Sequence, residues 1–172
     1  MSLLIFVKRK IDIIHRLNAK NYELNEIVSK MSDLSSYSSS IGDGMVSMSD
    51  MMHAPSSMLG RMMMFAQFSH NAAIQMTQQQ MTQMQPMLAA QSQQIKDAAQ
   101  AAQYQNWIQH CIYQQAREYL GKMEAQTLNE QEKKLQKEKT HIETEIRMLE
   151  QELQSVERAE ENGIKSWAPK YV

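Results

Sequence analysis

Residues 128–162 read LNEQEKKLQKEKTHIETEIRMLEQELQSVERAEEN, and this stretch decides the fold class. Aliphatic side chains recur in it at intervals of seven, and a second set occupies the complementary position of the same repeat. Such spacing keeps one side of a helix against a partner helix. We therefore predict a coiled-coil helix over residues 121–162. Its seam is formed by Leu128, Leu135, Ile142, Ile146, Leu149, Leu153 and Val156.

This helix requires a partner. Burying one Leu or Ile contributes roughly 1.5–3 kcal/mol before chain entropy is subtracted, so one short seam is marginal alone. The partner is either the N-terminal helix folding back or another subunit. Asn162 and Gly163 form a typical helix stop, which predicts a non-helical tail over residues 163–172.

Residues 1–35 have the spacing of an amphipathic helix. Its early polar side is basic, so two interpretations compete. Residues 1–20 could lie on an anionic membrane surface, or the helix could dock onto the rest of the fold. Docking is favoured because the apolar stripe continues beyond the basic segment. The stripe consists of Val7, Ile11, Ile14, Leu17, Leu24 and Val28.

Residues 36–57 are rich in serine and methionine and have no regular apolar period, so we predict a connector. Residues 58–120 regain helical spacing after Pro55, with a kink or end expected near Pro86. We interpret their apolar side as an assembly face. It consists of Met58, Met62, Phe65, Met76, Met84, Ile95, Ile108 and Ile112.

The middle region is unusual in its lack of charge. Between Arg61 and Arg117 the only charged side chains are Lys96 and Asp97. Glutamine and methionine are flexible helix formers, and a helix made of them can be covered without burying an ion. We interpret the tract as a helical region that other protein surrounds. The alternative is a polar, low-complexity tract with a tendency to aggregate.

The composition supports the same class. The chain has 172 residues with 5 Gly, 3 Pro and 16 Met, and its aromatic content is low. Few turn-forming and sheet-forming residues favour an all-α, elongated protein with long helices. No window has the roughly 20 apolar residues of a membrane span, and the N-terminus lacks a signal-peptide pattern. We expect a cytoplasmic protein, or an extracellular or virion protein that travels without a cleavable signal.

No pattern indicates chemistry. A phosphate-binding glycine loop, a paired zinc-binding histidine motif and a nucleophile elbow are all missing from the sequence. We therefore predict no catalytic, cofactor-binding or metal-binding residue, and no enzyme activity. A net charge of −1 and a short basic patch also argue against nucleic-acid binding.

The amphipathic N-terminus, the Gln/Ala/Met-rich middle and the C-terminal heptad helix together resemble the axial subunits of bacterial flagellar and type III secretion filaments. The same layout is similar to helical structural proteins packaged in phage virions. The resemblance is limited to the order of these three segments. It implies polymerisation between subunits.

We expect a structural protein that self-assembles into a homo-oligomer or filament. One alternative is a helical adaptor or chaperone that binds apolar helices of other proteins through flexible methionines. Another is a peripheral membrane protein held by residues 1–20.

Overall fold

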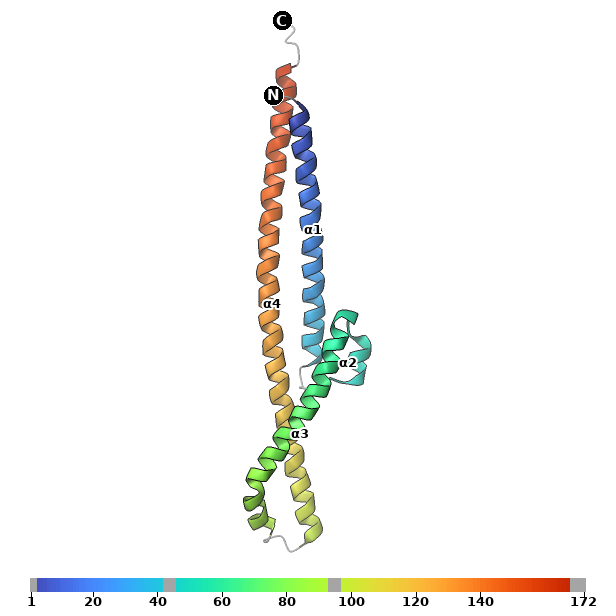
Figure 1. The fold of residues 1–172 in the computed structure, drawn as a ribbon, viewed down its shortest axis with the longest axis vertical. Coiled ribbons are helices and arrows are strands. Elements are labelled where there is room, and N and C mark those ends of the chain that lie inside the picture. The colour runs from blue at the N-terminus through green and yellow to red at the C-terminus, as the bar shows by residue number, and fades with distance from the viewer. Residues whose placement is uncertain (1–2, 42–45, 93–96, 168–172) are drawn as a thin grey trace. The chain divides into compact units, whose positions relative to one another are not determined.

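The fold consists of α-helices. The computed structural model describes residues 3–41, 46–92 and 97–167, and these residues contain no strand. The helices are α1 (Leu3–Ser40), α2 (Met48–His53), α3 (Ser56–Ser92) and α4 (Ala98–Trp167) (Figure 1). The prediction of an all-α protein with long helices is confirmed.

The chain divides into two compact units. Unit 1 combines residues 1–32 with residues 132–172, and unit 2 comprises residues 33–131. Helices α1 and α4 contribute residues to both units, whereas α2 and α3 belong to unit 2.

Unit 1 is an antiparallel pair of α1 and α4, which run side by side (Figure 1). Lys10 Nζ lies 2.9 Å from Glu157 Oε1, and Lys20 Nζ lies 3.0 Å from Glu145 Oε2. As residue numbers rise along α1, those of the partners on α4 fall, which fixes the direction of the pair. The hydrogen bond from Lys20 also lowers the pKa of Glu145.

The core of unit 1 lies along the contact between these helices. Ile13 is fully buried and Ile27 is 8% exposed, while Ile146 and Leu149 of α4 are 9% and 6% exposed. The α4 residues belong to the seam predicted from the sequence. Within unit 1, the other seam residues are partly buried: Leu135, Ile142, Leu153 and Val156.

Only part of the predicted stripe of α1 lies in the contact with α4. Leu17 and Leu24 are partly buried, but Ile13 and Ile27 form the buried contact. Apolar residues adjoin at positions 13–14 and at positions 27–28, so spacing alone does not decide which residue of each pair faces the partner helix. The stripe residues that remain exposed are Val7, Ile11, Ile14 and Val28.

Unit 2 contains the end of α1, the short helix α2, the whole of α3 and the first part of α4. Helix α2 starts at a capping box, in which Ser47 and Asp50 exchange side-chain to backbone hydrogen bonds. Three of the buried residues, Tyr37, Met62 and Leu128, come from α1, α3 and α4. Apolar anchors from three helices therefore meet in one core.

Several helix boundaries differ from the predicted ones. Helix α1 continues to Ser40 because Leu34 and Tyr37 are buried anchors in its serine-rich end. The expected connector contains α2. Helix α3 passes through Pro86 to Ser92, and Leu88 is buried beyond the proline.

The predicted stop at Gly163 is also wrong, because α4 continues through this residue to Trp167. A helical glycine costs roughly 1 kcal/mol relative to alanine, which a strong helix on its N-terminal side can absorb. The remaining tail, residues 168–172, and the side chain of Ile95 lie outside the described residues.

Candidate assembly surfaces

The inner side of α3 packs within unit 2. Met62 and Ala73 are fully buried, and Phe65 is 8% exposed. Two polar residues share this side, and each satisfies its hydroxyl on its own helix. Ser69 Oγ donates to the carbonyl oxygen of Ala66 at 3.2 Å, and Thr77 Oγ1 donates to that of Ala73 at 2.7 Å.

Most residues predicted as an assembly face belong to this interior. Met62, Phe65 and Ile112 are buried, and the others that the structure describes are partly buried. They hold the chain's own helices together because an apolar side of a helix is first covered by its neighbours in the same chain. The partly buried members are Met58, Met76, Met84 and Ile108.

The opposite side of α3 is exposed and has no charge. We define the outer face of α3 as Met63, Met64, Gln67, Phe68, Asn71, Gln75, Gln78 and Gln79. Met64 is 69% exposed, Phe68 is 63% exposed and Met63 is 57% exposed. Two features of the sequence pointed to this face: the lack of charge between Arg61 and Arg117, and the run of three methionines at 62–64, which places methionine on both sides of the helix.

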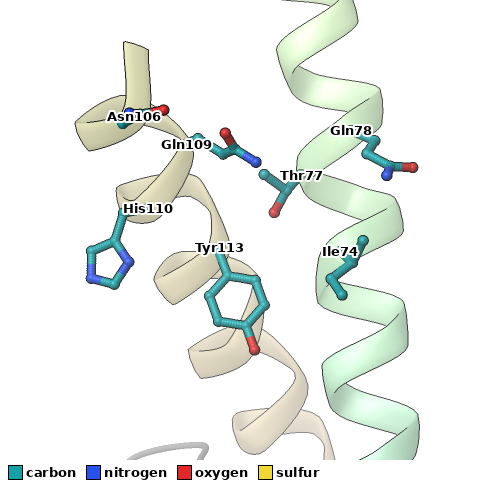
Figure 2. Close-up of a pocket in the computed structure, with 7 residues that line it drawn as sticks. All are labelled: Ile74, Thr77, Gln78, Asn106, Gln109, His110 and Tyr113. Atoms are coloured by element: carbon teal, nitrogen blue, oxygen red, sulfur yellow. The ribbon is translucent and has the colours of Figure 1, made fainter. Parts of the chain in front are cut away.

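A shallow groove lies between α3 and the first part of α4, with a volume of about 250 Å³ (Figure 2). Gln109 and Thr77 point toward one another across it, whereas His110 points away from α3. The groove offers amide, hydroxyl and imidazole groups and no carboxylate or thiol. It is lined by Ile74, Thr77, Gln78, Asn106, Gln109, His110 and Tyr113.

Several polar side chains around this groove are already paired. His70 Nδ1 lies 2.8 Å from the Tyr113 hydroxyl, and His110 Nε2 lies 2.9 Å from Gln114 Nε2. The first of these contacts links α3 to α4 across the groove, and the second lies within α4. We therefore read the groove as part of the α3–α4 contact.

A charged cluster lies at the other end of the α3–α4 contact. Arg61 Nε is 2.8 Å from Glu124 Oε1, and Arg61 Nη1 is 2.6 Å from Gln131 Oε1. The guanidinium group lies 5.7 Å from the centre of the Tyr37 ring, and the Tyr37 hydroxyl donates to Glu124 at 3.3 Å. Burial, followed by the charge of Glu124, raises the pKa of Tyr37. This cluster joins α1, α3 and α4.

Arg117 is a second cation of unit 2, 7% exposed, and its Nε atom has no hydrogen-bond partner.

Two classes of site are missing from the described part of the chain. Its residues contain no group of three or more His, Cys, Asp and Glu side chains that could hold a metal ion. No helix in residues 3–41, 46–92 and 97–167 is long and apolar enough to cross a membrane.

Comparison with protein-family models, with curated protein sequences and with solved structures found no significant match.

Proposed function

We propose that this protein is a structural subunit that self-assembles through helix packing, and that the outer face of α3 is its main contact. The observation that carries the proposal is the chemistry of this face. It exposes large apolar side chains and amides on a helix whose only Lys, Arg, Asp or Glu residue is Arg61. A helix side that stays in water normally carries charges, which keep copies of a protein apart.

Helix α4 provides the comparison within the same chain. Its part in unit 1 exposes Lys133, Lys134, Glu150 and Glu161, among other charges. The α3 surface is therefore different from the ordinary water-facing surface of this protein. Contact with other copies explains why it lacks charge, since covering Met, Phe and Gln leaves no ion without water.

We also propose that the α1–α4 pair of unit 1 is an antiparallel coiled coil. The buried or partly buried positions of α1 alternate in steps of three and four, as do the seam positions of α4. The pair would then be a stiff element that carries the assembling unit. On α1 these positions are Ile13, Leu17, Lys20, Leu24, Ile27 and Met31.

The test is a pair of opposite charges, Gln79→Glu in the outer face of α3 with Gln83→Lys one turn further along the helix. Both residues are exposed. In a chain that stays alone, such an i,i+4 pair is neutral or stabilises the helix by about 0.2–0.5 kcal/mol. Between packed copies it must lose its water, which costs several kcal/mol. We expect unchanged helical circular dichroism and a smaller species in sedimentation velocity.

The matched control is Gln151→Glu with Ser155→Lys, at the same spacing on an exposed part of α4 in unit 1. It should sediment as the unaltered protein does. If the α3 pair and the control both leave sedimentation unchanged, and Phe68→Glu does as well, the outer face of α3 is not a contact between copies.

A second candidate function is binding of other proteins' apolar helices. Exposed methionines favour it, since Met48 is 76% and Met52 is 82% exposed on α2, in addition to the exposed methionines of α3. Light scattering separates the two functions. Growth with protein concentration supports self-assembly, whereas a small species of constant mass favours an adaptor.

A further inference from the structure

Helix α1 carries a second regular set of side chains besides its buried contact with α4. We call this set the outer stripe. Its positions alternate in steps of three and four, which is the spacing of a helix–helix contact. The set begins with four aliphatic residues, continues with three asparagines and ends with valine. Its members are Leu4, Val7, Ile11, Ile14, Asn18, Asn21, Asn25 and Val28.

All eight residues of the outer stripe are exposed. Leu4 is 76% exposed, Ile11 is 52% exposed and Val28 is 44% exposed. Single exposed aliphatic residues are ordinary on protein surfaces. Aliphatic residues at successive positions of a heptad repeat, beside another heptad contact, are typical of a helix that packs between two partners.

We propose that the second partner is another copy of this chain, with its α1 parallel to the first and in register. Parallel, in-register pairing places each position of the stripe opposite itself. Aliphatic residues then meet aliphatic residues at the first four positions, and asparagines meet asparagines at the next three.

An antiparallel pairing centred on the stripe gives a poorer match. Leu4 would face Val28, but Ile11 would face Asn21 and Ile14 would face Asn18. Each asparagine amide would be covered by aliphatic carbon without a hydrogen-bond partner, which is costly. Between identical asparagines the amide of one copy donates to the amide of the other, and such pairs fix the register of helix dimers.

The charges beside the stripe favour a protein partner over an anionic membrane. Val7 and Ile14 lie one turn from Lys10 on the same side of α1, and Lys10 is bound by Glu157 and Glu160 of α4. These carboxylates would face an anionic lipid surface together with the apolar residues. They would therefore oppose membrane binding.

The carboxylates that would oppose membrane binding favour the binding of a second copy of this chain. Lys8 lies one turn from Leu4 and from Ile11, on the other border of the stripe, and it has no ion pair within the described residues. In the parallel pair, a two-fold axis runs along the helices. It places the Lys8 border of one copy next to the Glu157 border of the other copy. The two borders that meet in the parallel arrangement therefore carry opposite charges.

This contact and the outer face of α3 lie in different units of the chain, so either can fail alone. The proposed α1 contact rests on the proposed function in one respect: both require that copies of this chain associate. The experiment is therefore done in the Gln79→Glu, Gln83→Lys background, in which the α3 contact is removed.

The test uses opposite charges at one position of the stripe. Asn18→Asp and Asn18→Lys are made in separate chains. In the parallel pair each places like charges opposite one another and should weaken dimerisation at least about tenfold. Mixing the two variants should restore it, because Asp then meets Lys. Sedimentation equilibrium measures all three samples, with Gln151→Asp and Gln151→Lys as the control pair.

The outcomes are distinct. If the mixture associates no better than either variant alone, position 18 does not meet itself and the parallel pairing is wrong. If the unaltered chain floats with vesicles of anionic lipid and Ile11→Asp abolishes flotation while leaving its mass unchanged, the stripe is a membrane contact instead.

Cross-linking gives an independent check. The chain has a single cysteine, Cys111, which can be replaced by serine. Asn21→Cys in that background should form a disulfide-linked dimer on mild oxidation, because the two thiols face one another. Gln151→Cys should remain largely monomeric under the same conditions. Equal yields for the two variants would contradict the proposal.

Discussion

Arg61 and Glu124 form an ion pair of 2.8 Å between α3 and α4, with side chains that are 28% and 18% exposed. The ring of Tyr37 from α1 lies beside the guanidinium group. These two charges thus hold together the three helices whose apolar residues form the core of unit 2.

Replacing Glu124 with Gln should therefore destabilise the protein. A hydrogen bond to a charged group contributes about 1.5–3 kcal/mol, and partial exposure places this pair near the lower end of that range. Urea unfolding followed by circular dichroism measures the change. Glu130→Gln, at an exposed position on the same helix, should stay within about 0.5 kcal/mol of the unaltered protein. Equal effects of the two substitutions would mean that the ion pair contributes nothing.

Tyr37 should make the protein sensitive to alkaline pH. Its pKa in the folded state lies above the ordinary value of 10.0, mainly because the phenol is buried. A raised pKa means that the folded state favours the neutral phenol. The corresponding stabilisation is complete below the ordinary pKa and is lost as pH rises toward the pKa of the folded state.

We expect the free energy of unfolding to fall between about pH 9 and pH 11 more steeply in the unaltered protein than in Tyr37→Phe. Urea unfolding over this range measures both slopes. In the folded protein, ultraviolet absorbance should show Tyr37 ionising above the ordinary tyrosine pKa of 10.0, as a contribution that Tyr37→Phe lacks. Identical slopes for the two proteins would exclude a role for this phenol.

Adjacent residues of α4 provide a test of the helix pair in unit 1. Leu149 is 6% exposed, whereas Met148 is 56% exposed. Leu149→Asp should cost at least about 3 kcal/mol, because it removes a buried side chain and places a charge in the contact. Met148→Asp should cost less than about 1 kcal/mol, which reflects helix propensity. Thermal unfolding at low protein concentration measures both, and a reversed order would place the wrong side of α4 against α1.

The sequence predicted the long helices. In the contact between α1 and α4, it also predicted the residues that α4 contributes. On α4 the apolar seam is bordered by Lys and Glu, so only one side of the helix was available for packing. On α1 the two candidate sides begin with similar aliphatic residues, and the choice between Ile13 and Ile14 depended on where α4 lies. The side that α4 leaves uncovered is the one from which we infer a second contact.

The prediction for the middle region, residues 58–120, was incomplete for a related reason. Met62 and Phe65 were correctly placed on the apolar side of a helix, and they are buried within the chain itself. The exposed residues Met63, Met64 and Phe68 were not singled out because methionine occupies both sides of α3. Pro86 and Gly163 did not end their helices, since the long helix that precedes each of them outweighs a single unfavourable residue.

The missing charge on α3 also affects how copies of the protein approach one another. With a net charge of −1, the chain has almost no long-range repulsion from its own kind, and α3 adds no local barrier. Dissolved salt has little electrostatic interaction to screen at such a face. Association through the outer face of α3 should therefore change little with ionic strength.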